Sequence, residues 1–189
     1  MPPRLVMLSL EDRIAPVAFI ALGSNLGDSR ELLRQAMNRL QTLTDEPLCR
    51  SSLWQTTPVD CPPGSPAFVN AVVGLVPRAE ETPESLLARL QALEREFGRR
   101  PKQALNEPRP LDLDLIAWGR ETRAGPMLVL PHPRAHQRRF VLAPLAELAP
   151  DLILPGQPHP VKTLLAGLVR DEMAERLTIE KEASFPPVP

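Results

Sequence analysis

A strict alternation of leucine and aspartate between Arg109 and Ile116 constrains the fold of this chain more than any other feature. Successive side chains of a β-strand point to opposite faces of the sheet, so the run predicts a strand with one acidic and one apolar face. Asp112 and Asp114 share the acidic face, and the apolar face carries Leu111, Leu113 and Leu115.

The two carboxylates of that strand start from Cα atoms about 6–7 Å apart and repel each other unless a cation or a strong donor lies between them. Mg²⁺ suits this pair, because it binds hard oxygen ligands and typically takes one or two carboxylates together with water and substrate phosphates. Arg109, just before the strand, would add a forked donor for phosphate. An ordinary half-solvated antiparallel strand shows the same alternation, so both interpretations stay open on this segment alone.

Length and composition favour one domain that acts on small molecules. The chain has 189 residues, enough for one core, and we expect a domain at 17–172 between proline-containing tails at 1–16 and 173–189. A net charge of −1 gives no reason to expect a nucleic-acid partner. No export signal, membrane-spanning run or cysteine framework is visible, so we expect a soluble, cytoplasmic protein. We also expect it to be a monomer.

Periodicity and turn signals predict an α+β fold in the order strand, helix, strand, strand, helix, strand. Thr82 followed by Pro83 is a strong helix start, and Gly98 ends that helix. The expected strands cover 17–22, 49–57, 68–76 and 111–116. The expected helices cover 29–43, 83–97, 139–148 and 161–170, with an extended piece at 127–130. This order is typical of a ferredoxin-like βαββαβ core, an antiparallel sheet with helices packed on one face, here with C-terminal additions.

Asn70 lies inside a strongly apolar predicted strand, where its amide needs hydrogen-bond partners. A flat heterocycle with its own donors and acceptors would satisfy the amide. Phe68, two residues earlier on the same strand face, could line the same pocket. A buried asparagine that bonds to the protein backbone remains the alternative.

Further polar residues could contact a nucleotide. A basic loop carries Arg99, Arg100, Lys102 and Arg109, and His132 lies in a turn between two prolines. Gln91 and Glu94, three residues apart on a predicted helix, could meet a base or a ribose. The plainer interpretations are that the loop is simply solvated, that His132 has no role in binding, and that Gln91 and Glu94 form a surface pair. The segment from Gly23 to Gly27 lacks the lysine and hydroxyl residue of a phosphate loop, which favours a structural turn.

Six segments, in their order and spacing, resemble the 6-hydroxymethyl-7,8-dihydropterin pyrophosphokinase family of folate synthesis. They are Ala21 to Gly27, Phe68 to Ala71, Glu94 with Gly98 and Arg99, Pro108 to Asp114, Pro131 with His132, and Arg138 to Pro150. The resemblance covers about Val17 to Leu168. It implies an enzyme that transfers the terminal pyrophosphate of ATP to the hydroxymethyl group of the pterin and releases AMP.

The resemblance also implies roles for individual residues. Two Mg²⁺ ions would be held by Asp112 and Asp114. The nucleotide and its phosphates would be contacted by Gln91, Glu94, Arg99, Arg109, His132 and Arg138. The pterin would be read at its polar edge by Asn70, sandwiched by Phe68 and Phe140, and enclosed by backbone at Thr56 and Val59. The loop from Arg99 to Pro110 would close over both substrates as a lid.

The chain departs from the family pattern at three places. Many members have Trp-Gly-Pro-Arg where this chain has Asn106 to Arg109, and Pro101 replaces a second lid arginine. Phe68 stands where a tyrosine is familiar, which keeps ring stacking and removes a hydroxyl. Two other functions remain open: a non-catalytic pterin- or nucleotide-binding module on the same fold, and an Mg²⁺-dependent phosphotransferase that yields ADP.

Overall fold

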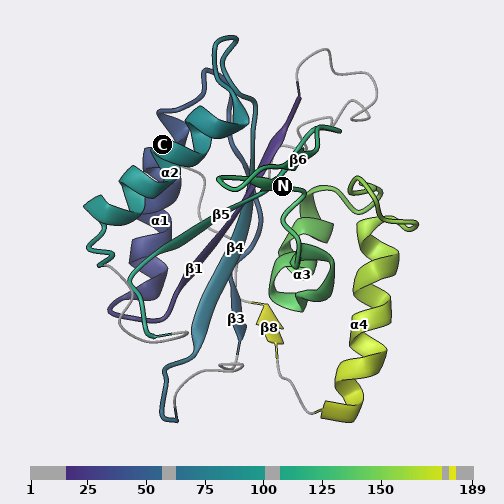
Figure 1. Ribbon diagram of the computed structural model, residues 1–189. Helices are drawn as coiled ribbons and strands as arrows, with labels where there is room; N and C mark the ends of the chain where they lie inside the picture. Colours follow the sequence, from purple (N-terminus) through teal and green to yellow (C-terminus); the bar gives the residue numbers. More distant parts are fainter. Residues whose placement is uncertain (1–15, 57–62, 101–106, 176–178, 182–189) are drawn as a thin grey trace.

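The computed structural model describes residues 16–56, 63–100, 107–175 and 179–181, which form an α+β fold of three layers. An antiparallel sheet lies between two pairs of helices (Figure 1). One face is covered by α1 (Ser29–Gln41) and α2 (Pro83–Glu96), and the other by α3 (Arg139–Leu148) and α4 (Val161–Glu175). The two helices of the expected core, α1 and α2, lie on one face as predicted, and the C-terminal additions α3 and α4 cover the other face.

The central strand of the sheet is β1 (Ala18–Ser24), which pairs antiparallel with two long strands. These are β4 (Phe68–Leu75) on one side and β5 (Asp112–Trp118) on the other. The order along the sheet is β5-β1-β4-β3-β8, in which β3 covers Trp54–Thr56 and β8 covers Ile179–Lys181. The short strand β2 (Cys49–Arg50) lies off this path and also pairs with β4. A separate two-stranded ribbon joins β6 (Arg123–Ala124) to β7 (Val129–Leu130), and a short 3-10 helix covers Ala135–Gln137.

All seven residues of β1 are buried, because both faces of this strand contribute to a core. Ala18, Ile20 and Leu22 pack with the apolar stripes of α1 and α2. Phe19 and Ala21 point to the other side and pack with α3 and α4. A central strand with two buried faces holds its neighbours rigidly, and this positions the side chains at its carboxyl end.

The helices begin where the sequence predicts. The Asp28 side chain accepts the Glu31 amide at 3.2 Å and caps α1, and the Thr82 side chain accepts the Ser85 amide at 3.1 Å and caps α2. Pro83 occupies the first helical position of α2, where its missing N–H removes no hydrogen bond. Gly98 follows α2 with a φ of +88°, a left-handed conformation that glycine adopts without strain.

The expected strand at 49–57 is divided into β2 and β3 by a local interruption at Ser51. The Ser51 side chain takes the Val72 amide at 2.9 Å and donates to the Ser52 carbonyl at 2.8 Å. A serine side chain that bonds to backbone in this way competes with regular strand pairing. The strands β6 and β8 were not predicted from sequence. No helix in the described residues is both long and apolar enough to cross a membrane.

Candidate active site

Residues from three strands meet in one row across the carboxyl end of β1. Gly23 is the register partner of Asn70 in β4 and of Asp112 in β5, and Ala21 is the partner of Asp114. Directly paired residues of antiparallel strands point to the same face. Asn70, Asp112 and Asp114 therefore lie on the sheet face that α3 covers, and the three leucines of β5 are buried against α1 and α2 on the other face. The predicted division of β5 into an acidic and an apolar face is confirmed.

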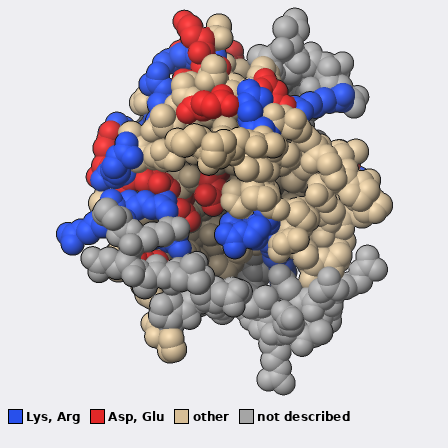
Figure 2. Space-filling model, in the orientation of Figure 1, with Lys and Arg blue, Asp and Glu red and all other residues tan. Residues whose placement is uncertain are grey.

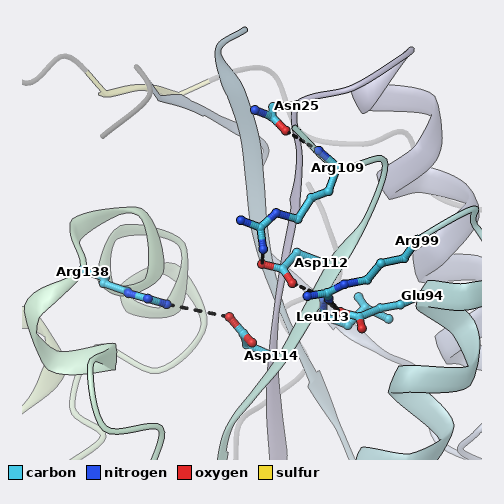
Figure 3. A network of polar contacts seen from close by, with 8 residues as sticks. All are labelled: Asn25, Glu94, Arg99, Arg109, Asp112, Leu113, Asp114 and Arg138. Carbon is cyan, nitrogen blue, oxygen red and sulfur yellow. Dashed lines mark hydrogen bonds and ion pairs between the residues drawn. The ribbon is translucent and has the colours of Figure 1, made fainter. Parts of the chain in front are cut away.

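Two arginines hold the Asp112 carboxylate (Figure 3). Arg99, one residue beyond Gly98, donates to Asp112 Oδ1 at 2.7 Å, and Arg109 donates to Asp112 Oδ2 at 3.3 Å. Both guanidinium groups come from the two ends of the basic loop, so the loop is anchored at each end to the same acid. If the Asp112 carboxylate bound a metal cation instead, the guanidinium groups of Arg99 and Arg109 would be available to donate to phosphate oxygens.

Glu94 is buried beneath this network, with 7% of the residue exposed. It accepts the Leu113 amide at 2.7 Å and a hydrogen bond from Arg99, and so fixes α2 to β5. Burial raises the pKa of Glu94 to about 7, against the lowering effect of its hydrogen bond from Leu113 and the charge of Arg99. The interpretation of Gln91 and Glu94 as a surface pair holds for Gln91, which is exposed, and is wrong for Glu94.

The raised pKa of Glu94 predicts a stability that falls with rising pH in the metal-free protein. Between pH 4.5, the ordinary value, and about 7, the folded state holds a proton that the unfolded state has lost, so raising the pH favours unfolding. We expect the Tm to drop across this window and the drop to become smaller in Glu94→Gln. Thermal unfolding in EDTA at pH 4.5 and 7.5 measures it. The control is Glu96→Gln, at an exposed position of the same helix. If this variant reduced the pH-dependent drop in Tm as much as Glu94→Gln does, the assignment of the drop to Glu94 would be contradicted.

Asp114 lies on the α3 side of the site, where Arg138 Nη1 approaches its Oδ2 at 3.8 Å (Figure 3). Burial and the charge of Asp112 raise the pKa of Asp114, while the His132 and Arg138 charges lower it. Burial lowers the pKa of His132, which favours a neutral ring near pH 7. The Arg134 amide donates to His132 Nδ1 at 3.2 Å, so the proton of the neutral ring belongs on Nε2.

Asn25 is a site residue that sequence reasoning did not single out. It is 2% exposed, its side-chain Oδ1 accepts a hydrogen bond from the Arg109 backbone N–H at 2.9 Å, and its own backbone N–H donates to the Arg109 carbonyl at 3.2 Å. This reciprocal pair fixes the backbone from which Arg109 reaches Asp112 (Figure 3). The signal available in the sequence was an asparagine that follows the apolar strand by only a few residues. Asn25 Nδ2 and Arg109 Nε are buried donors without a hydrogen-bond acceptor among the described residues.

The predicted heterocycle residues also lie on the α3 face. The Asn70 Nδ2 group donates to Thr56 Oγ1 at 2.9 Å, so a side chain holds the amide rather than backbone. Phe68, the register partner of Thr56, is half-buried two residues before Asn70. Phe140 is half-buried in α3, and the Arg138 guanidinium lies 5.4 Å from its ring centroid. Val59 lies outside the described residues.

The donor set fits Mg²⁺ shared with a phosphate ligand. The described residues contain no group of three or more His, Cys, Asp or Glu that could enclose a metal. Asp112 and Asp114 supply two carboxylates on one face, which is the number that Mg²⁺ commonly takes from a protein when substrate phosphates complete its coordination. Burial first, and then the charge of Asp112, raise the pKa of Asp114, and a divalent cation between the two carboxylates would offset both effects.

Acidic and basic side chains gather around the hollowed middle of one face of the molecule (Figure 2). A family model described as 7,8-dihydro-6-hydroxymethylpterin-pyrophosphokinase, HPPK, matches residues 19–150. The chain belongs to the HPPK family. The matched residues include all of β1 except Ala18, the Asn70 strand, the Glu94 helix and the two aspartates, so the match covers the whole network described above.

Two curated relatives resemble the chain over most of their length. A 2-amino-4-hydroxy-6-hydroxymethyldihydropteridine pyrophosphokinase from Porphyromonas gingivalis is 40% identical over 137 residues, 71% of this chain and 91% of that protein. The protein of the same name from Pseudomonas aeruginosa is 40% identical over 149 residues, 78% of this chain and 90% of that protein.

The solved structure of Plasmodium falciparum HPPK-DHPS wild type with pteroate has the same fold, with a TM-score of 0.65 at 13% identity. The alignment covers 86% of this chain and 44% of that one, so the chain spans less than half of that larger protein.

Proposed function

We propose that the protein transfers pyrophosphate from ATP to 6-hydroxymethyl-7,8-dihydropterin, giving the pterin diphosphate and AMP for folate synthesis. The row formed by Asn70, Gly23 and Asp112 carries the proposal, because it sets an amide that reads a heterocycle beside an acid that serves phosphate chemistry. Membership of the HPPK family and relatives at 40% identity support the same activity. The strand order of β1 to β5 supports a ferredoxin-like core as its scaffold.

The triphosphate would lie between the basic groups and the two acids. Arg99 follows α2, Arg109 precedes β5 and Arg138 precedes α3, so their charges converge from three sides. The buried Arg109 Nε and Asn25 Nδ2 donors lack acceptors among the described residues, and phosphate oxygens would supply acceptors after a small shift. The exposed Gln91 would meet the nucleoside on the α2 side, and the buried Glu94 would act from beneath by holding Arg99.

The pterin would occupy the β4 and α3 side of the row. Thr56 holds the Asn70 amide in place, so the amide meets the ring without losing side-chain freedom on binding. Phe68 and Phe140 would enclose the ring from the strand and from the helix, with backbone at Thr56 closing the pocket beside Asn70. These positions would set the hydroxymethyl oxygen beside the acids.

The reaction needs positioning and charge stabilisation more than covalent help from the protein. His132, neutral with its proton on Nε2, would donate a hydrogen bond toward phosphate oxygen. Arg99, Arg109 and Arg138 would stabilise the charge that develops on the transferred group. Two Mg²⁺ ions, held by Asp112 and Asp114, would supply further charge neutralisation when bound.

A coupled assay for AMP tests this proposal. With ATP, Mg²⁺ and the hydroxymethyl pterin all present, we expect one AMP for each pterin diphosphate. A pterin-binding module on this fold would bind the pterin without turnover, and a simple phosphotransferase would release ADP. Either result would refute the proposed activity. We expect a monomeric enzyme of the cytoplasm.

A further inference from the structure

The interruption between β2 and β3 is bound by a side chain of α3. β2 ends at Arg50 and β3 begins at Trp54, and both strands pair with β4. Between them, the Ser52 backbone N–H donates to Glu147 Oε2 at 3.1 Å. Ser52 is 4% exposed, so its backbone N–H needs an acceptor within the protein. A helix side chain therefore takes part in the backbone hydrogen bonding of this interrupted strand.

The same carboxylate also holds a side chain of β3. Glu147 Oε1 accepts a hydrogen bond from Trp54 Nε1 at 2.6 Å, so its two oxygens accept from two donors of one segment. An ionised carboxylate makes shorter and stronger hydrogen bonds than a neutral acceptor does. Because the donors precede or belong to β3 and the acceptor belongs to α3, this bridge of Ser52, Trp54 and Glu147 fixes the helix to the strand.

The bridge joins the two elements that carry the residues assigned to the pterin. Trp54 is the register partner of Asn70, so both side chains lie on the sheet face that α3 covers. Two residues further along β3, Thr56 holds the Asn70 amide. On α3, Phe140 precedes Glu147 by seven residues, which is about two helical turns and places both on one side of the helix.

Local interactions alone do not fix α3. The helix has no side-chain hydrogen bond at its N-cap, and it contains Pro144. Proline lacks a backbone N–H, so the Phe140 carbonyl, four residues earlier, receives no helical hydrogen bond and the helix can bend there. Such a helix takes its position from tertiary contacts. Apolar side chains of α3 pack on the sheet and on α4, and Glu147 adds the polar anchor after the proline.

We propose that Glu147 is a positioning residue, which sets the separation between Phe140 and the Asn70 amide by fixing α3 to β3. Without the bridge, both groups stay in the fold but their separation varies, and a rigid ring then binds more weakly because binding must restore the order. Arg99 and Arg109 are anchored by α2 and β5, so the nucleotide side does not depend on the bridge. The inference rests on the proposed function, because it concerns affinity for the pterin.

Glu147→Gln tests the bridge with little change of shape. A glutamine side chain has one carbonyl oxygen and one NH₂ group, so it cannot accept from both donors with separate oxygens. Glu147 is exposed, and we expect a moderate effect: about fivefold weaker affinity for 6-hydroxymethylpterin, with affinity for a non-hydrolysable ATP analogue within about twofold of wild type. Wild-type pterin affinity in the folded variant, or an equal loss for both ligands, overturns the proposal.

Glu84→Gln is the matched control. Glu84 also joins two elements, because it accepts a hydrogen bond from Arg123 of β6 at 2.7 Å, and it begins the helix on the other face of the sheet. We expect this variant to bind the pterin with the affinity of wild type. A fivefold loss in Glu84→Gln as well would show that any broken surface bridge has this effect, and the specific role of Glu147 would be lost.

The Trp54 indole supplies a readout that a general loss of stability would not reproduce. The chain has two tryptophans, and Trp118 is buried in the core on the opposite face. We expect Glu147→Gln to shift the indole N–H resonance of Trp54 in NMR spectra and to leave that of Trp118 in place. In a Trp54→Phe background the same substitution should weaken pterin binding less, because one donor is already absent. Equal losses in both backgrounds overturn the bridge.

The two proposals fail in different ways. Wild-type protein that forms no AMP refutes the proposed function whatever Glu147 does. Active wild-type protein, with pterin affinity that Glu147→Gln leaves unchanged, refutes the positioning role alone. If Glu147→Gln does not fold, Trp54→Phe decides, because it removes one donor of the bridge and keeps an aromatic ring. Unchanged pterin affinity in that variant overturns the proposal.

Discussion

Replacing Asp114 with asparagine is expected to lower kcat about a thousandfold while leaving pterin affinity within about threefold. The change removes one of the two charged oxygen donors on this face of β5 and keeps the shape of the side chain. Loss of metal-assisted charge stabilisation costs several kcal/mol in the transition state, and each tenfold in rate corresponds to about 1.4 kcal/mol. Steady-state AMP formation and calorimetric pterin titration measure the two quantities.

The same variant should be more stable than wild type when no metal is present. Burial and the Asp112 charge raise the pKa of Asp114, so its charged form destabilises the metal-free fold at neutral pH. Asparagine removes that charge, and the Tm in EDTA should rise. The exposed Asp151→Asn is the control for the substitution itself. A near-normal kcat in Asp114→Asn, or a lower Tm in EDTA, would contradict the role given to this carboxylate.

Replacing Asn70 with alanine is expected to weaken pterin binding about a hundredfold and to leave binding of an ATP analogue unchanged. The amide would make about two hydrogen bonds to the ring edge, each contributing roughly 1–1.5 kcal/mol. Thr56→Val removes only the group that holds the amide, at 2.9 Å in the structure, so its effect should be intermediate.

Competition binding with 6-hydroxymethylpterin ranks these variants. The expected order of affinity is wild type, then Thr56→Val, then Asn70→Ala. An equal loss of ATP-analogue affinity in Asn70→Ala would show a general disturbance of the fold rather than a pterin contact.

The local sequence was sufficient to predict the elements that carry most of the site. Thr82, Pro83 and Gly98 bound α2 within a residue or two, and the leucine and aspartate alternation of β5 placed both acids on one face. These predictions succeed because caps and alternation depend on residues that are close in sequence.

The layers of the fold were harder to predict. The expectation of core helices on one face left the C-terminal pair, α3 and α4, unplaced, although the apolar run of β1 carries large side chains at both even and odd positions. A strand of this kind indicates burial on both faces. The face of the sheet that each helix covers depends on packing between segments that are distant in sequence, so no local sequence pattern predicts it.

Long-range polar contacts were the other gap. The pairing of Asn25 with Arg109 joins residues 84 positions apart, and the burial of Glu94 depends on an amide donated by Leu113. Helical periodicity places Glu94 only at the margin of the apolar stripe of α2. The family resemblance supplied the functional interpretation of Glu94 and Arg109, and the structure supplies their contacts with Leu113 and Asn25.

The nature of the nucleotide product tests the central claim most directly. Purified protein with ATP, Mg²⁺ and 6-hydroxymethyl-7,8-dihydropterin should form AMP and pterin diphosphate in equal amounts, and EDTA should stop both. Formation of ADP in place of AMP, or no product with all three components present, would contradict the account.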